Sequence, residues 1–130
     1  MAILQIGAGG VGWVVAHKAA QNNEVLGDIT IASRTIAKCE KIIESIKGKN
    51  NLKDSTKKLE ARSVDADDVD ALVALIKEVQ PDLVINAGPP WVNMAIMEAC
   101  YQSKVSYLDT SVAVDPVSYT HLTLPTTVFV

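Results

Sequence analysis

The sequence predicts an α/β fold of the Rossmann type, a doubly wound parallel sheet with helices on both faces. Short apolar or β-branched runs alternate with segments whose apolar residues recur three and four positions apart, the patterns of strands and amphipathic helices. A glycine cluster, "GAGGVG" at 7–12, separates the first such run from the first helical segment. Strands and helices that alternate in this way form right-handed crossovers between parallel strands.

The first two units each pair an apolar strand with a helix. The segment "AILQI" at 2–6 is a short apolar run, and the helix expected at 9–23 begins directly after it, within the glycines. "DITIAS" at 28–33 is rich in β-branched residues, as strands are. The helix expected at 34–48 ends on Gly48, a residue type that favours helix C-termini.

A polar loop at 50–58 leads to the second half of the predicted sheet. The strand expected at 59–65 is half-polar, which favours a place near a sheet edge. The helix expected at 65–80 opens with acidic residues, which suit a helix N-terminus, and stops before Pro81. The strand at 82–88 is continuously apolar, as expected when helices cover both faces of the sheet.

One more helix and strand complete the pattern. The helix expected at 89–104 has prolines at its start, where a missing N–H costs nothing, and a fifth strand follows at 105–111. We therefore expect residues 1–115 to form one NAD(P)-binding Rossmann domain that is partial, with about five β-α units and no substrate domain.

Composition argues against several classes of function. The chain has 130 residues, of which 48% are hydrophobic and 21% charged, as in ordinary globular domains. Its net charge of −3 argues against a nucleic-acid or anionic-membrane partner, since both need a basic face. No apolar run approaches the ~20 residues of a membrane span. The N-terminus lacks the basic head of a signal peptide, so we expect a cytoplasmic protein.

The glycine cluster has the spacing G-x-G-x-x-G of a dinucleotide-binding turn. Gly7 makes the tight turn, Gly9 lets the backbone approach a pyrophosphate, and Gly12 lets helix and strand pack closely. The helix N-terminus then offers free N–H groups to the phosphates. Short-chain reductases instead carry G-x-x-G-x-x-G, and here Trp13 occupies the place of their third glycine; we expect it to pack rather than touch cofactor. The residues expected at the phosphates are Gly7, Ala8, Gly9, Gly10, Val11 and Gly12.

The end of the second strand distinguishes NADP(H) from NAD(H). NAD-binding domains place an acid there, about 20 residues after the glycines, to hold the ribose hydroxyls. No carboxylate occurs in "IASRTIAK"; the stretch offers Ser33, Arg34, Thr35 and Lys38 instead. Arg34 in the first turn of a helix opposes the macrodipole unless it meets an anion. A 2′-phosphate is such an anion, and a guanidinium matches it bidentately, so we expect NADP(H).

Other cofactor contacts are expected where the third, fourth and fifth strands end. Asp65 and Ala66 are placed beside the adenine ring by topology, while Asp67 and Asp68 are better explained as helix caps. Asp109 ends the fifth strand. It is equally expected to line the nicotinamide end of the site or to have a structural role. The residues expected to pass the ribose and nicotinamide are Asn86, Ala87 and Gly88.

The remaining reactive residue types form no recognisable catalytic or metal-binding set. His17 lies mid-helix and is expected to be packed or at the surface. Cys39 and Cys100 fit no metal-binding spacing and are expected to be reduced and buried. We therefore predict no catalytic residue and no metal ligand within the chain.

Five short motifs, in this order and spacing, resemble the N-terminal NADP-binding domain of the saccharopine dehydrogenase family. That family includes saccharopine reductases and carboxynorspermidine synthases, and the start of the chain resembles bacterial members of the second group. The resemblance covers residues 1–115. The motifs are "IGAGGVG", "ASRT", "VDADD", "QPDLVINAGPP" and "YLDTS".

The resemblance implies NADPH-dependent reduction of an imine that forms from an amine and an aldehyde. It also implies an amino-acid or polyamine-type substrate, bound by a domain that follows the fifth strand, in a full-length homodimer. The chain of 130 residues would then be a cofactor-binding fragment that catalyses nothing alone. A second hypothesis is a non-catalytic nucleotide-sensing module, such as a potassium-channel gating domain. Such modules usually keep the ribose-binding acid, so the Ser33-Arg34 pair counts against it.

The C-terminal segment 116–130 differs from everything before it. It is rich in threonine and has no charged residue apart from the titratable His121. The codons of "VSYTHLTLPT" can be written as one reading frame of the transposase-derived adapter used in DNA sequencing libraries, and a stop codon of that frame falls after Val130. A genuine final strand would carry Pro125 in its middle, which a central strand does not tolerate. We expect this segment to be foreign to the protein.

Overall fold

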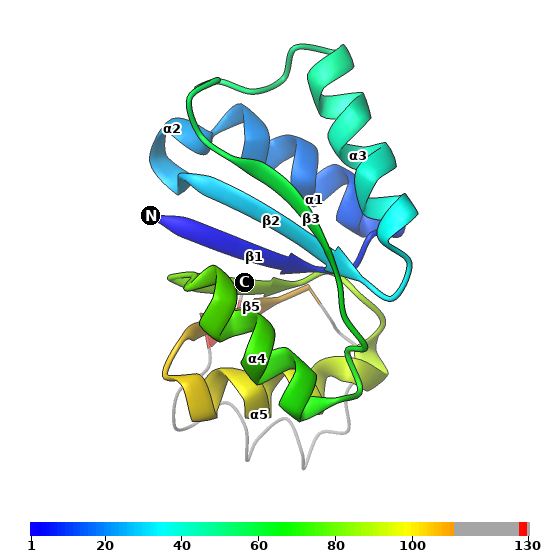
Figure 1. Cartoon of the computed structure of the whole chain (residues 1–130), viewed down its shortest axis with the longest axis vertical. Coiled ribbons are helices and arrows are strands. Elements are labelled where there is room, and N and C mark those ends of the chain that lie inside the picture. Colours follow the sequence, from blue (N-terminus) through cyan, green and yellow to red (C-terminus); the bar gives the residue numbers. More distant parts are fainter. Residues whose placement is uncertain (111–127, 130) are drawn as a thin grey trace.

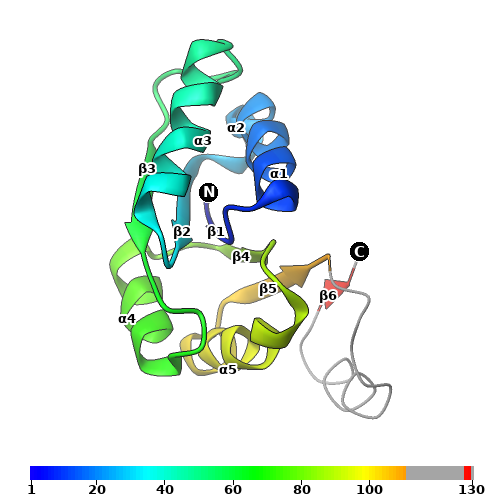
Figure 2. The same cartoon turned by 90° about the vertical axis from the view of Figure 1, so that its right-hand side faces the viewer.

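The computed structural model describes residues 1–110 and the backbone of 128–129, which form one parallel sheet of six strands. The strand order is β3-β2-β1-β4-β5-β6, so the chain reverses direction across the sheet between β1 and β4. Figure 1 and Figure 2 show α1, α2 and α3 together on one face and α4 and α5 on the other. The predicted doubly wound Rossmann fold is confirmed.

The elements follow one another as the sequence predicted, with two short helices and one short strand in addition. In chain order they are β1 Ala2–Ile6, α1 Gly10–Gln21, α2 Asn23–Leu26, β2 Asp28–Ser33, α3 Ile36–Gly48, β3 Leu59–Ser63, α4 Val69–Val79, β4 Leu83–Asn86, the 3-10 helix η1 Pro90–Val92, α5 Asn93–Ser103, β5 Ser106–Asp109 and β6 Val128–Phe129.

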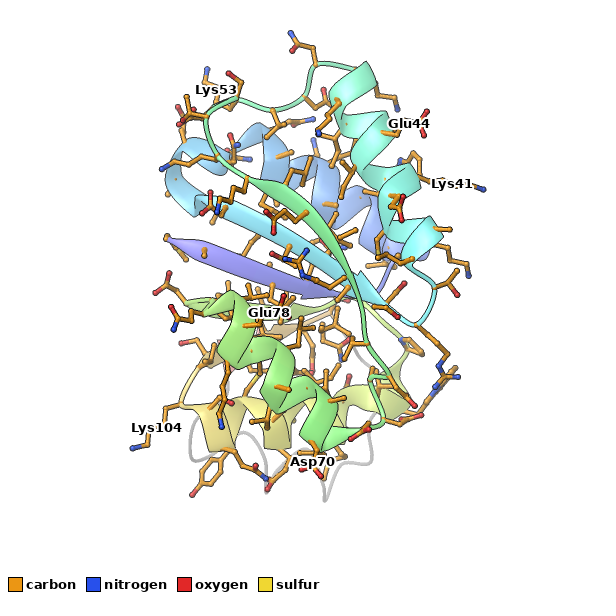
Figure 3. The ribbon with its side chains drawn as sticks, viewed as in Figure 1. Lys41, Glu44, Lys53, Asp70, Glu78 and Lys104 are labelled. Atoms are coloured by element: carbon orange, nitrogen blue, oxygen red, sulfur yellow. The ribbon has the colours of Figure 1, made fainter. Side chains whose placement is uncertain are left out.

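Side chains of β1 alternate between two cores, as a strand with covered faces requires. Ile3 packs with residues of α1 and α3, whereas Leu4 and Ile6 pack with residues of α4 and α5. The outer face of α3 carries charged side chains, and Figure 3 shows Lys41 and Glu44 pointing away from the sheet. This burial of apolar stripes is the main force that holds the helices on the sheet.

Strand β3 lies at the sheet edge, as its half-polar sequence predicted, and most of its residues are only partly buried. The predicted helix at 9–23 is wrong at its end. Asn22 leaves helical geometry (φ −123°, ψ 20°), its side-chain amide donates to the carbonyl of Lys18 at 2.8 Å, and α2 follows as a separate turn. The helix predicted at 34–48 begins only at Ile36, so Arg34 lies in the turn before it.

Strand β6 was not predicted. Its two residues pair in parallel with β5, Val128 beside Leu108 and Phe129 beside Asp109. The rest of the segment 116–130, which we predict to be foreign, lies outside the described residues. Backbone pairing depends little on side-chain identity. The pairing of β6 with β5 therefore does not test the prediction that the segment is foreign. Within the described residues no helix is both long and apolar enough to cross a bilayer.

Candidate nucleotide-binding site

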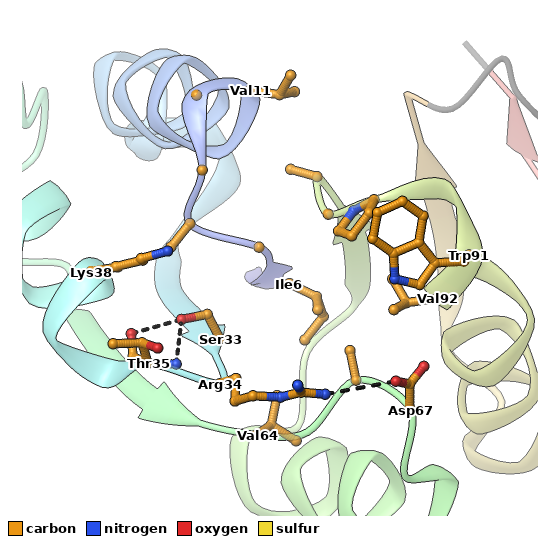
Figure 4. Close-up of a pocket in the computed structure, with 18 residues that line it drawn as sticks. Ile6, Val11, Ser33, Arg34, Thr35, Lys38, Val64, Asp67, Trp91 and Val92 are labelled. Atoms are coloured by element: carbon orange, nitrogen blue, oxygen red, sulfur yellow. Dashed lines mark hydrogen bonds and ion pairs between the residues drawn. The ribbon is translucent and has the colours of Figure 1, made fainter.

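A pocket of about 690 Å³ lies at the carboxyl ends of the strands, beside the reversal between β1 and β4 (Figure 4). Open parallel sheets bind their ligands at this edge. The turns after β1, β2, β3 and β4 all contribute to its wall. The lining residues are Ile6, Gly7, Ala8, Gly9, Gly10, Val11, Ser33, Arg34, Thr35, Lys38, Val64, Ala66, Asp67, Ala87, Gly88, Pro89, Trp91 and Val92.

Gly7 occupies a position that only glycine fits. Its φ of +113° is rare for residues with a side chain. A Cβ there would lie 2.6 Å from the nitrogen of Gly88 and 2.7 Å from the carbonyl carbon of Ala87. The turn after β1 therefore touches the turn after β4, and together they form the floor of the pocket.

Gly12 is buried behind the pocket rather than in its wall. A Cβ on Gly12 would lie 2.5 Å from the carbonyl oxygen of Gly7, so the close packing predicted for the third glycine is confirmed. The buried side chain of Gln5 reinforces this contact. Its amide nitrogen donates to the carbonyl oxygens of Gly7 at 3.0 Å and Gly12 at 2.8 Å. Sequence reasoning missed Gln5, although a polar residue inside an apolar strand just before the motif was a usable signal.

The first turn of α1 faces the pocket with its backbone N–H groups uncapped. Gly9 is the N-cap, no side chain among the described residues accepts a hydrogen bond from the turn, and no acidic residue occurs in it. A Cβ on Gly9 or Gly10 would meet no atom of the described part of the chain within 4 Å, so the backbone here borders open space. Free N–H groups and the positive end of the helix dipole make such a turn suitable for an anion.

The turn after β2 is fixed by the hydroxyl of Ser33. That hydroxyl donates to the carbonyl of Thr35 at 2.8 Å and accepts from the backbone N–H of Thr35 at 3.2 Å (Figure 4). The thiol of Cys39 also donates to it at 3.3 Å. These contacts hold the turn so that Arg34 and Lys38 both line the pocket.

The guanidinium of Arg34 lies beside two carboxylates from the turn after β3. One Nη nitrogen is 3.0 Å from Asp65 and 3.7 Å from Asp67. The backbone N–H of Asp67 and the Arg34 guanidinium both donate to the Asp65 carboxylate and lower its pKa. The expectation that Asp67 caps a helix is wrong. Asp68 is the N-cap of α4, accepting from the N–H of Ala71 at 3.1 Å, which leaves Asp67 in the pocket wall.

A buried polar network lies behind the turn after β4. Asn86 accepts the backbone N–H of Gly88 at 2.9 Å, and its amide nitrogen donates to Asn93 and, at 3.2 Å, to the hydroxyl of Tyr107. Tyr107 donates to Asp109 at 2.8 Å. Burial raises the pKa of Tyr107, the bond from Asn86 opposes the shift, and Asp109 adds to it. Asn86 therefore shapes the turn at Gly88 from behind it, and Asp109 is buried and lies outside the pocket wall.

All the residues predicted to contact the cofactor line this one pocket except Gly12, Asp65 and Asn86. Sequence reasoning missed several apolar members of the wall and one large aromatic residue. Trp91 lies in η1, shortly after β4, and is 76% exposed. The usable sequence signal was a tryptophan just beyond the carboxyl end of a predicted strand. The lining residues that were not predicted are Ile6, Val64, Asp67, Pro89, Trp91 and Val92.

The residues for which the sequence predicts no catalytic or metal-binding role make packing contacts within the fold. The His17 ring stacks on Trp13 with centroids 5.1 Å apart and makes a 3.0 Å hydrogen bond to Ser45 of α3. His17 is buried, whereas Trp13 stays 38% exposed and lies outside the pocket wall. Cys39 and Cys100 are free and buried, and burial raises the pKa of the Cys100 thiol to about 12. In the part of the chain that the structure describes, no cluster of three or more His, Cys, Asp or Glu residues could hold a metal ion.

Comparison with known families gives a match over residues 3–126, to the saccharopine dehydrogenase NADP binding domain. The chain belongs to this family. Membership in the saccharopine dehydrogenase NADP-binding family confirms both the predicted resemblance and NADP(H) as the cofactor.

Curated relatives of the chain are longer than it is. Carboxynorspermidine synthase of Vibrio alginolyticus is 91% identical over 115 residues, 88% of this chain and 28% of that protein. The Vibrio cholerae enzyme of the same name is 87% identical over the same length. Carboxyaminopropylagmatine dehydrogenase of a Synechocystis species is 38% identical over 109 residues, 84% of this chain and 25% of that protein. The chain thus spans about a quarter of the length of these relatives.

Among solved structures, apo saccharopine dehydrogenase (L-Glu forming) from Saccharomyces cerevisiae has the same fold. It superposes with a TM-score of 0.68 at 21% identity, over 92% of this chain and 23% of that one. A UDP-glucose 4-epimerase from Stenotrophomonas maltophila superposes with a TM-score of 0.65 at 16% identity, over 87% and 37%. At these identities the likeness shows the Rossmann fold alone.

Proposed function

We propose that this chain is the NADP(H)-binding part of an oxidoreductase that reduces an imine formed from an amine and an aldehyde. The main observation in favour of a cofactor site is the set of groups that line the pocket. An uncapped helix N-terminus borders the pocket after β1, and two cations border it after β2, Arg34 from the turn and Lys38 from the start of α3. A pyrophosphate suits the first feature, and a 2′-phosphate suits the second.

The pocket can accept the ligand in shape as well as in charge. The Cβ positions of Gly9 and Gly10 point into space that no atom occupies within 4 Å, which leaves room for phosphate oxygens at the backbone. Val64 and Ala66 line the part of the pocket near Arg34, where an adenine ring would lie, and Trp91 and Val92 line the part near the turn after β4, where a nicotinamide would lie. When bound, the nicotinamide supplies or accepts a hydride; the residues named here bind and orient it.

The proposed reaction is based on the names of the curated relatives. Two curated relatives are named carboxynorspermidine synthase and one is named carboxyaminopropylagmatine dehydrogenase. A secondary amine that carries a carboxylate forms when an aldehyde condenses with an amine and a hydride reduces the imine. We further propose a substrate of the amino-acid or polyamine type, which binds outside the chain described here. The whole enzyme is proposed to be a cytoplasmic homodimer. A nucleotide-sensing module that prefers NAD is disfavoured by Arg34 and by the family.

Titration of the chain with NADPH and with NADH tests the cofactor proposal. We expect NADPH to bind more tightly, and equal affinities for the two would contradict the proposed site. The reaction is tested separately with the longer enzyme that contains this domain. It should consume NADPH only when an aldehyde and an amine are both present and should yield a secondary amine, whereas the chain of 130 residues should consume none.

A further inference from the structure

Of the two cations that line the proposed 2′-phosphate site, Arg34 is accompanied by carboxylates. Arg34 lies 3.0 Å from one carboxylate and 3.7 Å from another, those of Asp65 and Asp67. All three side chains are more than half exposed. Figure 4 shows Arg34 reaching from the turn after β2 toward Asp67 on the turn after β3. A phosphate that binds Arg34 therefore enters a place where the positive charge is already partly balanced.

The two carboxylates are held differently. One oxygen of Asp65 accepts both the Arg34 guanidinium and the backbone N–H of Asp67, each at 3.0 Å, so its position is fixed by two bonds, and it lies outside the pocket wall. The Asp67 carboxylate lines the pocket and, among the described residues, accepts no hydrogen bond; its contact with Arg34 is electrostatic only. Asp65 thus positions Arg34, while Asp67 presents an unbonded negative charge to the pocket.

Lys38 differs from Arg34 in this respect. It also lines the pocket, and in the part of the chain that the structure describes no carboxylate lies within ion-pair distance of it. A 2′-phosphate near Arg34 and Lys38 gains attraction from both cations but also meets repulsion from Asp67. Like charges a few ångströms apart at a surface interact by an amount comparable to an exposed ion pair.

We infer that Asp67 determines how strongly the site prefers a 2′-phosphate, by opposing it beside Arg34. The inference rests on the proposed function, since it concerns the adenosine end of the same cofactor site. Asp67 weakens binding of the phosphorylated nucleotide and has little effect on a nucleotide with free ribose hydroxyls. Removing its charge therefore increases the preference for NADP(H).

Two small nucleotides isolate this end of the site. Adenosine 2′,5′-bisphosphate and ADP both carry adenine and phosphate groups, but only the first has a 2′-phosphate. We expect Asp67→Asn to bind adenosine 2′,5′-bisphosphate about two- to fivefold more tightly by calorimetric titration of the chain, with ADP affinity unchanged. Because Asp67 is exposed and makes no side-chain hydrogen bond among the described residues, the variant keeps its fold, which its circular dichroism checks.

The matched control is Asp68→Asn, which removes the same charge one residue further along. Asn caps a helix as well as Asp does, so α4 remains intact. This control should leave both affinities close to those of the unchanged chain.

Three outcomes overturn the inference. They are an unchanged or weaker affinity of Asp67→Asn for the bisphosphate, an equal gain for both nucleotides, and an equal gain in the Asp68→Asn control. If the unchanged chain binds neither nucleotide, the proposed cofactor site fails and the inference fails with it. That result is distinguishable, because it appears before any variant is compared.

Discussion

The side-chain amide of Gln5 donates a 2.8 Å hydrogen bond to the carbonyl oxygen of Gly12, which ties the middle of β1 to the first turn of α1. A second bond, to the carbonyl of Gly7 at 3.0 Å, comes from the same nitrogen. The turn between β1 and α1, where we propose that phosphate binds, is therefore held from beneath by a fully buried polar side chain. Its conformation depends on Gln5 as well as on the glycines themselves.

Replacement of Gln5 by Leu should lower both stability and nucleotide affinity. It removes the side-chain donor that both the Gly7 and the Gly12 carbonyl oxygens share, at a cost of about 1–3 kcal/mol, and frees the turn to move. Urea unfolding measures the first effect, and NADPH titration of the folded variant measures the second.

The matched control for Gln5→Leu is Asn23→Leu. Asn23 is equally buried and also makes two hydrogen bonds through its amide, to Asp54 at 2.8 and 2.7 Å, but far from the pocket. It should lose stability and keep its affinity. If both variants keep their affinity, the turn does not need Gln5 for its shape.

Replacement of Gly9 by Val should abolish cofactor binding while the fold survives. Gly9 has extended geometry (φ −86°, ψ −158°), which a β-branched residue also adopts, and its Cβ would point into open space. The branched side chain would then occupy the place of the pyrophosphate. Gly48→Ala, at the end of α3 with equally open surroundings, is the control and should bind normally. Normal binding by Gly9→Val would show that no phosphate approaches this backbone.

Much of this site was predictable because its residues follow from local rules. Strand β2 is found at the predicted residues 28–33, and the glycine spacing placed the turn between β1 and α1 correctly. Both signals depend on residues close in sequence, where the apolar period and the demands of a tight turn act directly.

The contacts that were not predicted join distant residues. The same local rule allows Asp67 or Asp68 to cap α4, and only the folded turn shows that Asp68 does so. The approach of Arg34 to Asp67 depends in turn on the pairing of β2 with β3. Tertiary contacts decide between such alternatives, and a local sequence pattern does not specify those contacts.

Trp91 should report binding of the whole dinucleotide through its fluorescence. Its indole is 76% exposed and lines the pocket, whereas Trp13, the other tryptophan, is stacked on His17. We expect NADP⁺ to change the emission, and adenosine 2′,5′-bisphosphate, which lacks the nicotinamide, to leave it nearly unchanged. The response should persist in Trp13→Phe and vanish in Trp91→Phe. A response carried by Trp13 instead would place the nicotinamide elsewhere.

The segment 116–130 should prove foreign to the gene. The interpretation of this segment as adapter sequence rests on its codons, so sequencing the source DNA is the decisive measurement. The Vibrio alginolyticus relative aligns over 115 residues at 91% identity, while the family match extends to residue 126. We expect amplification from source DNA, with primers outside the region, to read past Asp115 into different codons. A read that reproduces "VSYTHLTLPTTVFV" and its stop would make the segment part of the protein.

Replacement of Arg34 by Gln should reduce the preference for NADPH over NADH. The Arg34 side chain is 74% exposed, its guanidinium is hydrogen-bonded to Asp65, and the residue lines the pocket together with Lys38. A hydrogen bond between charged groups contributes about 1.5–3 kcal/mol, and the opposing charge of Asp67 places the expected loss near the lower end of that range, about tenfold in NADPH affinity. NADH, which has no 2′-phosphate, should bind as before.

The control for Arg34→Gln removes the same charge from a residue outside the pocket wall. Arg62 is paired with Glu60 and Glu78, each at 3.0 Å, on the outer surface of β3 and α4. Its replacement by Gln changes the net charge equally, so it separates a local phosphate contact from the general field of the protein. An equal loss of NADPH affinity in both variants would assign the effect to net charge. A loss confined to Arg34→Gln, smaller at high salt, is the result expected of a direct contact with the 2′-phosphate.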